Sequence, residues 1–354
     1  MRILTPLLAL ASLALAGCAT DSTPSRVAAV HSNPVLDSDF PDPALIRAPD
    51  GFYYAYATQT ERDGKMINIQ AARSSDLVAW QHLGDALPAK PTWASKTQDF
   101  WAPHVERDGA RYIMYYSAKP DNADERHGLC LAVATASSPA GPFVDVGKPL
   151  LCGETFVNID PMAYDDPATG KRLLYWGSGF KPIKVQELAA DRLSFAPGSS
   201  PTDLVWPNLT KDAFPVLVEG AWVVRRGGWY YMFYSGDNCC GTKANYAVMV
   251  ARSRSATGPY QTLEQATGKP YSIILEKSGH WFAPGHNAIV TDNAGRDWIV
   301  YHAVDVRRPR QKPSDDINTR RVMLIDRIVW ENGWPVIVRP AGGQPAASAP
   351  GEAR

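Results

Sequence analysis

A unit of about 60 residues recurs five times along this chain of 354 residues. Each unit has a turn glycine followed by a strand-like run of aromatic and branched apolar side chains, as in Gly51-Phe52-Tyr53-Tyr54. The five turn glycines are 58, 61, 58 and 67 residues apart: Gly51, Gly109, Gly170, Gly228 and Gly295. A later strand also recurs, at residues 71–75, 134–138 and 251–255. Any fold proposed for the chain must therefore repeat the same order of strands five times.

Short strands between Gly, Pro, Asp and Asn, with no long helical period, indicate an all-β protein. A period of this length with several strands per unit is typical of a β-propeller, whose blades cannot bury both faces alone and close into a ring. A pair of β-sandwiches is the alternative, but it would not repeat one strand order five times. We therefore predict a five-bladed β-propeller over residues 33–340, which leaves no room for a second domain.

The first residues have the pattern of an export signal. Met1-Arg2 supplies a positive charge, residues 3–16 are almost continuously apolar, and Leu15-Ala16-Gly17 precedes Cys18. This ending resembles the lipobox of bacterial lipoproteins, although an ordinary signal peptide with an incidental cysteine is the alternative. We predict a signal peptide over residues 1–17, a lipidated Cys18 with a linker to residue 32, and a low-complexity tail over residues 341–354. The protein would be an exported lipoprotein, anchored by lipid alone and facing the periplasm or the cell surface.

The charge balance argues against nucleic acid as the main partner. The chain has 36 Lys and Arg against 36 Asp and Glu, and it has no basic run of the kind that binds phosphate backbones.

Four cysteines besides Cys18 would lie in an oxidising compartment. Cys130 and Cys152 could form a disulfide, whereas the adjacent Cys239 and Cys240 could pair with each other or have separate fates. A zinc site is the poorer interpretation because no CxxC or HxxxH motif accompanies them.

One ionisable residue beside Pro, Gly or Ala recurs at nearly the same phase of every repeat. These residues precede the turn glycines by 9, 5, 10, 9 and 9 positions: Asp42, His104, Asp160, Glu219 and His286. If the blades are equivalent, the five side chains converge at one mouth of the central channel. Carboxylates gathered there would repel one another and lose hydration, a costly arrangement that function explains better than structure. The repeat thus predicts a site with three carboxylates and two histidines.

These motifs together resemble glycoside hydrolase family 43. The segments that carry the resemblance run in order along residues 33–339: Asp-Phe-Pro-Asp-Pro, Phe-Trp-Ala-Pro-His, Asn-Ile-Asp-Pro, Val-Glu-Gly-Ala, Pro-Gly-His-Asn and a late Arg-Arg-Val-Met-Leu-Ile-Asp-Arg. The resemblance implies an inverting glycosidase that acts on arabinan, arabinoxylan or xylan. The related fructan-cleaving propellers usually carry Asn-Asp-Pro-Asn, Arg-Asp-Pro and Glu-Cys motifs, and this chain has none of the three.

The resemblance also implies a role for each matched position. Asp42 would be the general base and Glu219 the general acid, with Asp160 tuning the pKa of Glu219 and holding it in place. His286 would lie beside a calcium or other ion in the channel, often bound through water, and no organic cofactor is expected. Arg321 would contact the substrate. His104 is expected to line the site without an assigned role.

Aromatic residues near these motifs, namely Phe100, Trp101 and Trp176, are candidates to stack on sugar rings, although a core position is the more common role of tryptophan in a short strand. The segments around Trp176 and Cys239-Cys240 resemble the arabinan-active branch of the family, and no extra β-sandwich follows Pro340. These features favour an enzyme that cleaves α-L-arabinofuranosyl linkages in a polysaccharide or oligosaccharide. The protein is expected to be a monomer. A β-xylosidase or xylan-active enzyme and a non-catalytic glycan-binding lipoprotein are the alternatives. The sequence does not distinguish exo from endo cleavage.

Overall fold

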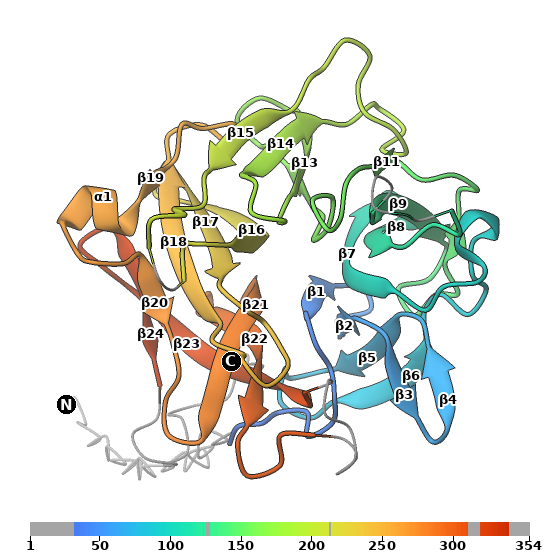
Figure 1. The fold of residues 1–354 in the computed structure, drawn as a ribbon, viewed down its shortest axis with the longest axis horizontal. Coiled ribbons are helices and arrows are strands. Elements are labelled where there is room, and N and C mark those ends of the chain that lie inside the picture. The colour runs from blue at the N-terminus through green and yellow to red at the C-terminus, as the bar shows by residue number, and fades with distance from the viewer. Residues whose placement is uncertain (1–31, 123, 125–127, 212–213, 311–318, 340–354) are drawn as a thin grey trace, which may run out of the picture.

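The computed structural model describes residues 32–122, 124, 128–211, 214–310 and 319–339, and their strands form five antiparallel sheets around a common centre (Figure 1). This arrangement confirms the predicted five-bladed β-propeller. The inner strands of neighbouring blades contact one another around the ring: β1 with β7 and β21, β12 with β7 and β16, and β16 with β21. The predicted signal peptide, Cys18 and the tail lie outside the described residues, as does nearly all of the linker.

The five sheets follow the chain in order, and each begins with its innermost strand. Blade 1 comprises β1 (Ala44–Arg47), β2 (Tyr53–Ala57), β5 (Gln70–Ser74) and β6 (Gln81–Asp85). Blade 2 comprises β7 (Phe100–Asp108), β8 (Arg111–Ala118), β9 (Cys130–Ala136), β10 (Val144–Asp145) and β11 (Leu151–Cys152). Blade 3 comprises β12 (Met162–Asp165), β13 (Arg172–Trp176), β14 (Ile183–Glu187) and β15 (Thr202–Val205).

Blade 4 comprises β16 (Val218–Arg226), β17 (Trp229–Gly236), β18 (Ala247–Ser253), β19 (Gln261–Thr262) and β20 (Ile273–Leu275). Blade 5 comprises β21 (Trp281–Thr291), β22 (Asp297–Asp305), β23 (Arg321–Glu331) and β24 (Trp334–Val338). A separate hairpin, β3 (Thr60–Arg62) with β4 (Lys65–Ile67), extends from blade 1. The helices in the described residues are short: η1 (Thr92–Ala94) and α1 (Leu263–Thr267). None of them has the length and apolarity needed to cross a bilayer.

The repeat glycines lie in the turns that join the first two strands of each blade. All five have positive φ, between 62° and 89°, a backbone region that glycine enters without the steric cost of a Cβ atom. The strands that follow are buried on both faces because each blade packs between two neighbours, so β2 and β8 are almost wholly buried. Half of the largest fully buried side chains are tyrosines from these strands, such as Tyr53, Tyr115 and Tyr301. The aromatic runs of the repeat thus form the core between blades.

Two disulfides join the four cysteines in the described part of the chain. Cys130–Cys152 links β9 to β11 at the edge of blade 2. Cys239–Cys240 joins neighbouring residues in the connection between β17 and β18. The structure therefore selects the vicinal pairing from the alternatives that the sequence left open for Cys239 and Cys240.

The ring closes where the start of the described chain pairs with blade 5. Leu36 forms a β-bridge with Met323 of β23. The Asn33 side chain continues this pairing, since its Oδ1 accepts the backbone N–H of Ile325 at 2.9 Å and its Nδ2 donates to the Ile325 carbonyl at 3.1 Å. The same amide donates to Asp326 at 3.2 Å. The Asn33 side chain thus pairs with Ile325, which precedes the part of β23 that pairs with β24.

We expect Asn33→Ala to lower the free energy of unfolding by about 1–3 kcal/mol, because it removes three hydrogen bonds, two of which hold the closure. Urea denaturation followed by tryptophan fluorescence would measure the change. Ser32→Ala, at an exposed neighbouring position, is the matched control and should leave the stability unchanged. Equal stability of the two variants would show that the Asn33 amide does not hold the ring closed.

Candidate active site

A residue with left-handed backbone lies just before the inner strand in blades 1 and 3, and within the inner strand in blades 2, 4 and 5. The values of φ are 57° for Asp42, 47° for Ala102, 59° for Asp160, 63° for Gly220 and 47° for His286. The strand register shifts at this point in β7, β16 and β21. A non-glycine residue in this region costs about 1–3 kcal/mol and persists only where its surroundings hold it.

Hydrogen bonds between blades hold these residues. The backbone N–H of Ala102 donates to Thr58 Oγ1 at 2.8 Å, and that of Asp160 donates to Ser117 Oγ at 3.1 Å. Similarly, the N–H of His286 donates to Ser235 Oγ at 2.8 Å.

In the remaining junctions the pattern changes. The N–H of Asp42 donates to His302 Nδ1 at 3.0 Å, and Ser178 turns its hydroxyl to the carboxylate of Glu219. The acceptor or donor side chain belongs each time to the second strand of the preceding blade or to the residues just after it. These side chains follow the turn glycines by seven or eight residues: Thr58, Ser117, Ser178, Ser235 and His302. This recurring position was a sequence signal that the prediction missed.

The Asp42 carboxylate is buried among cationic and polar groups. Its Oδ2 accepts the Thr58 hydroxyl at 2.5 Å, and its Oδ1 accepts from Arg321 Nη1 at 3.0 Å. His302 Nδ1 and His286 Nδ1 lie 3.3 Å and 3.6 Å from the same oxygen. Burial favours the neutral acid, but the positive charge of Arg321 outweighs it and holds the pKa of Asp42 well below its usual value. Asp42 is therefore a carboxylate at neutral pH.

The pKa of Glu219 is shifted in the opposite direction to that of Asp42. Its Oε2 accepts the Ser178 hydroxyl at 2.5 Å and its Oε1 accepts the Tyr246 hydroxyl at 2.7 Å. Burial raises the pKa of Glu219, and the nearby charge of Asp42 adds to the effect, while the two hydroxyl donors lower it only in part. Tyr246 in turn lies parallel to the His302 ring, with centroids 5.7 Å apart. The site therefore holds one ionised carboxyl group and one whose proton is retained to a higher pH than usual.

The pKa of Asp160 depends on both Glu219 and Asp42. Burial raises its pKa well above the usual value, and repulsion from Glu219 and Asp42 raises it further. Asp160 and Glu219 interact strongly enough to titrate as a pair that holds a proton to higher pH than either would alone. Asp160 is as deeply buried as Glu219, and within the described residues no side-chain hydroxyl equivalent to that of Ser178 or Tyr246 donates to it.

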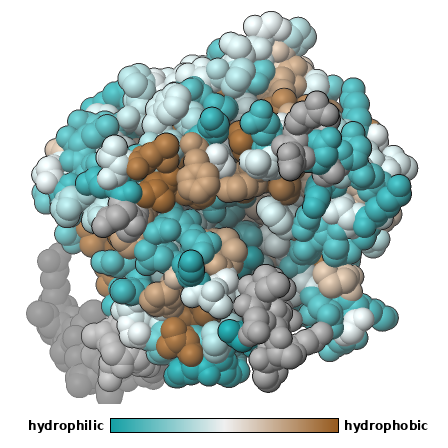
Figure 2. Space-filling view, in the orientation of Figure 1, coloured by the Kyte–Doolittle hydropathy of each residue, from teal (hydrophilic) through white to brown (hydrophobic). Residues whose placement is uncertain are grey.

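The carboxyl groups open into a cavity of about 800 Å³ to which all five blades contribute, a size common for ligand sites. Figure 2 views the face shown in Figure 1, and apolar side chains gather near its centre while hydrophilic ones dominate the periphery. Six of the predicted site residues line this cavity: Asp42, Trp101, Asp160, Glu219, His286 and Arg321. Residues that the sequence analysis missed also line it, among them Thr58, Met66, Phe156, Phe180, Leu217 and Asp237.

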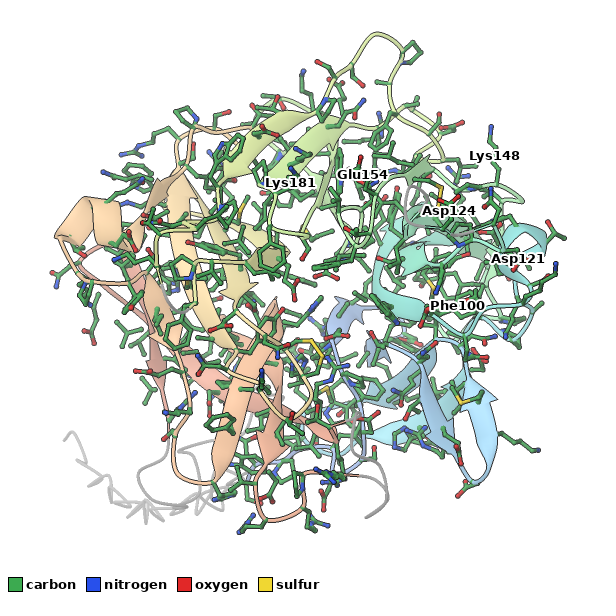
Figure 3. All side chains as sticks on the ribbon, viewed as in Figure 1. Phe100, Asp121, Asp124, Lys148, Glu154 and Lys181 are labelled. Atoms are coloured by element: carbon green, nitrogen blue, oxygen red, sulfur yellow. A yellow bond between two sulfur atoms is a disulfide. The ribbon has the colours of Figure 1, made fainter. Side chains whose placement is uncertain are left out.

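Three predicted site residues do not line the cavity, and their assignments are corrected. Phe100 is fully buried in blade 2, where it packs against Tyr116 (Figure 3). It precedes Trp101 in β7, and successive side chains of a strand point to opposite faces, so only Trp101 reaches the cavity. Trp176 is 1 % exposed, with its indole N–H bonded to Asn158. Neither Phe100 nor Trp176 is available to stack on a sugar.

His104 is the third correction. It lies within β7, beyond the register shift at Trp101, and its ring packs against Trp222 with centroids 5.2 Å apart. Burial lowers its pKa to about 4, so the ring is neutral at physiological pH. The spacing of His104 to its turn glycine, five residues instead of nine or ten, was the sign that its phase differs from that of the four other residues.

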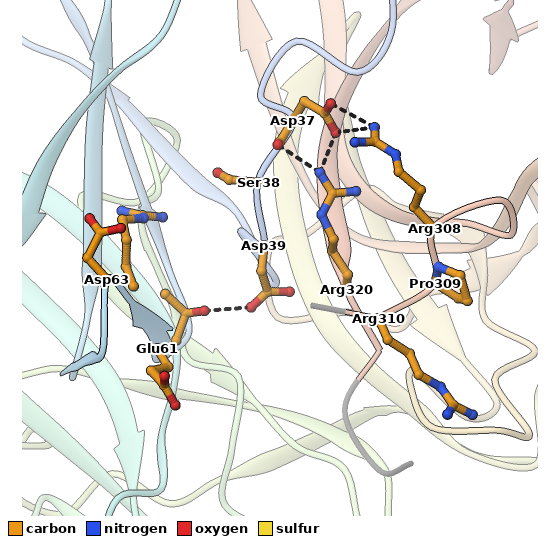
Figure 4. Close-up of a pocket in the computed structure, with 11 residues that line it drawn as sticks. Asp37, Ser38, Asp39, Glu61, Asp63, Arg308, Pro309, Arg310 and Arg320 are labelled. Atoms are coloured by element: carbon orange, nitrogen blue, oxygen red, sulfur yellow. Dashed lines mark hydrogen bonds and ion pairs between the residues drawn. The ribbon is translucent and has the colours of Figure 1, made fainter. Parts of the chain in front are cut away.

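A second cavity of about 810 Å³ adjoins the first, since Asp39, Thr60 and Glu61 line both (Figure 4). The side chains of Arg308 and Arg320 both bond to Asp37 there. The same loop holds Arg321, because Asp39 Oδ1 accepts the Arg321 backbone N–H at 2.9 Å and Arg321 O accepts the Phe40 N–H at 2.7 Å. These contacts hold the Arg321 backbone in place, and its guanidinium donates to Asp42.

The described residues contain no cluster of three or more His, Cys, Asp and Glu side chains arranged to hold a metal ion. His286 Nδ1 faces Asp42 and Asp160 at 3.6 Å and 3.7 Å. Burial lowers the pKa of His286, so its ring is neutral and able to act as a ligand. The donor set therefore fits an ion bound mainly through water, and not one enclosed by side chains.

Comparison with known proteins adds independent information. The sequence profile of Glycosyl hydrolases family 43 matches residues 31–335. A "Probable arabinan endo-1,5-alpha-L-arabinosidase A" of Aspergillus flavus is 27% identical over 330 residues, which cover 88% of this chain and 96% of the relative. An "Extracellular exo-alpha-(1->5)-L-arabinofuranosidase ArbA" of Cellvibrio japonicus is 25% identical over 84% of this chain and 86% of its own length.

A "Beta-D-galactofuranosidase xynD" of Aspergillus niger is 26% identical, over 86% of this chain and 84% of its own length. Among solved structures, a thermostable family-43 glycoside hydrolase superposes with a TM-score of 0.70 at 25% identity. The match covers 90% of this chain and 98% of that structure. The family match thus spans nearly all of the described propeller.

Proposed function

The chain belongs to glycosyl hydrolase family 43, a family of inverting glycosidases, and we propose that it cleaves α-L-arabinofuranosyl linkages in arabinan or arabinoxylan. The observation that carries the proposal is a pair of carboxyl groups, Asp42 and Glu219, that are buried in one cavity and whose pKa values are shifted in opposite directions. Inverting hydrolysis needs one carboxylate to activate water and one carboxylic acid to protonate the leaving oxygen on the opposite face of the sugar.

In the proposed mechanism Asp42 is the general base. Arg321 keeps it ionised, and the Thr58 hydroxyl holds one of its oxygens, so the other can take a proton from water as the water attacks the anomeric carbon. Glu219 is the general acid and donates its proton to the departing oxygen. Ser178 and Tyr246 orient the carboxyl group and stabilise the carboxylate that forms when the proton leaves.

We assign Asp160 to tuning the proton of Glu219. The two carboxyl groups titrate as a pair, so the last proton leaves the pair at a higher pH than Glu219 alone would allow. Arg321 contacts Asp42 and lines the cavity, which places a positive charge where substrate hydroxyl groups or the attacking water would lie. Trp101 is the predicted stacking residue that remains available to a sugar.

The choice of substrate rests on relatives. Two of the relatives described above are named for activity on arabinan or arabinofuranosides. The galactofuranosidase is a second candidate activity, because galactofuranose, like arabinofuranose, is a five-membered sugar ring. Xylan-type substrates are the further alternative. The non-catalytic glycan-binding alternative is set aside, because the chain belongs to a hydrolase family and keeps all three carboxyl groups in one cavity.

We also propose that the enzyme is a monomer tethered by a lipid on Cys18. The support is the sequence of residues 1–18 alone, in which an apolar run ends in Leu-Ala-Gly-Cys. A tethered enzyme would meet its substrate outside the cytoplasm, where soluble oligosaccharides or polysaccharide chains are present. Metabolic labelling with a fatty acid, absent from a Cys18→Ser variant, would test the anchor.

The wild-type protein is expected to release arabinose or arabino-oligosaccharides from nitrophenyl α-L-arabinofuranoside or linear arabinan. Asp42→Asn and Glu219→Gln should each lower kcat by about 10²–10⁴-fold, the usual contribution of a general acid or base. Steady-state assays would measure kcat, with nitrophenyl β-D-galactofuranoside and nitrophenyl β-D-xyloside as competing substrates.

Asp326→Asn is the control for these two variants. Asp326 is a buried carboxyl group whose pKa burial raises to about 6, but it bonds to Tyr301 and Asn33 away from the cavity. Its replacement should leave kcat within about twofold of wild type. Near-normal turnover by Asp42→Asn or Glu219→Gln would refute the assigned roles, and preferential cleavage of another glycoside would reassign the substrate.

Asp160→Asn should shift the alkaline limb of the kcat/KM profile to lower pH by about one unit. Glu219 must be protonated to act, so activity falls as pH rises through the pKa of the group. Without a neighbouring carboxyl group, Glu219 loses its proton at lower pH, because repulsion from that neighbour is absent. An alkaline limb that does not move in this variant would assign Asp160 to positioning alone.

A calcium ion beside His286 is proposed on the family resemblance and on the neutral imidazole. Such an ion would add positive charge near Asp42 and Asp160, and no step above depends on it. We expect prolonged chelation to remove one equivalent of calcium, detected by elemental mass spectrometry, and to lower activity severalfold until calcium is restored. Absence of bound metal with unchanged activity would eliminate the ion.

A further inference from the structure

We propose that the Cys239–Cys240 disulfide is a specificity-determining contact of the enzyme, an apolar surface against which one furanose ring of the substrate packs. The inference deepens the proposed function and rests on it. Both cysteines line the cavity that holds Asp42, Asp160 and Glu219, and both are half-buried. The disulfide therefore presents part of its surface to whatever fills that cavity.

The loop that carries the disulfide is held by other interactions. Asp237 Oδ2 accepts the Phe214 backbone N–H at 3.1 Å and the Asn245 side-chain amide at 2.9 Å. The N–H of Asp237 donates to Leu217 O at 3.2 Å, and that of Asn245 donates to Asn238 O at 2.9 Å. These bonds tie both ends of the loop to each other and to blade 4. The position of the loop thus does not depend on a covalent link between the two cysteines.

A bond between adjacent residues also adds little to stability through the unfolded chain. In the chain-entropy account a disulfide stabilises by closing a loop, and the effect grows with the number of residues enclosed. Cys239–Cys240 encloses none, whereas Cys130–Cys152 spans 22 positions and joins two strands. The second disulfide has the features of a structural link. The vicinal disulfide lacks these features, so a stabilising role does not account for it. Its exposure to the cavity points instead to contact with a ligand.

That surface suits the carbon face of a sugar. Joined sulfur atoms are polarisable and offer no N–H or O–H donor, so they favour contact with C–H groups over hydroxyl groups. Apolar side chains from blades 3 and 4 line the same cavity, including Phe156 and Phe180, whose rings meet edge to face at 6.1 Å. Arg321, the three carboxyl groups and Asp237 supply charged atoms to the same cavity. A furanose ring can use both kinds of surface, because it has a C–H face and outward hydroxyl groups.

The contact lies next to the reacting bond. Cys239 packs against a small buried cluster of Ala244, Tyr246 and Ala283, and the Tyr246 hydroxyl donates to Glu219 at 2.7 Å. A sugar in contact with the disulfide is therefore one that adjoins the linkage cleaved, not a distant unit of the polymer. The disulfide is expected to act on binding, because it has no group that exchanges protons with the substrate.

The test replaces both cysteines together, as Cys239→Ala/Cys240→Ala. We expect KM for arabino-oligosaccharides to rise about tenfold, the loss associated with removing a small apolar contact in a pocket, while kcat stays within twofold of wild type. The matched control, Cys130→Ala/Cys152→Ala, removes the disulfide that lies outside the cavity. It should lower the melting temperature and leave KM unchanged.

A second measurement covers the case in which the double variant does not fold. In the Cys130→Ala/Cys152→Ala background, phosphine reduction opens only the vicinal disulfide, and KM should rise on reduction and return on reoxidation. Unchanged KM in the reduced enzyme or in the double variant would overturn the proposal. A fall in kcat at constant KM would also overturn it, by assigning the disulfide to the support of Tyr246. If the wild-type enzyme cleaves no arabinofuranoside, the proposed function fails first and the inference fails with it.

Discussion

The site depends on a hydrogen bond between neighbouring blades. A left-handed residue in or just before the inner strand of one blade donates its backbone N–H to a side chain on the second strand of the preceding blade. This bond holds Asp42, Asp160 and His286 in a left-handed backbone conformation that costs energy in isolation. That conformation turns their side chains toward the cavity. The hydrogen bonds that join neighbouring blades therefore also orient the functional side chains. They recur around the channel with small differences.

Those small changes differentiate the blades. Where three junctions use a hydroxyl acceptor, the junction of blades 5 and 1 uses His302, which adds a ring beside Asp42. Where Ser178 would accept a backbone N–H, it donates to Glu219 instead. Burial favours the neutral form of every carboxyl group, and local partners then decide the outcome. Arg321 keeps Asp42 ionised, whereas burial and neighbouring carboxyl groups raise the pKa of Glu219 and of Asp160. The same position in two different repeats thus supplies two carboxyl groups, Asp42 and Glu219, whose pKa values are shifted in opposite directions.

Much of the fold and of the site was predictable from the sequence, for reasons that particular residues make clear. Turn glycines such as Gly109 are required by backbone conformation, so their spacing reported the repeat directly. Asp42, Asp160, Glu219 and His286 kept a nearly constant distance from those glycines and converge as predicted. His104 broke the spacing and lies elsewhere. Phe100 and Trp176 were misassigned because an aromatic residue in a short strand is equally compatible with core and cavity, and the face it occupies depends on its neighbours in space.

The sequence by itself determined the five-bladed architecture and the residues that gather at its centre, because local backbone requirements and strand periodicity recur at fixed intervals along the chain. Only the tertiary structure decided which aromatic side chains reach the cavity, that Cys239 and Cys240 pair beside it, and that Asp160 holds a proton together with Glu219. Desolvation and Coulomb interactions act through space between blades that are distant in sequence, so no spacing along the chain could express them.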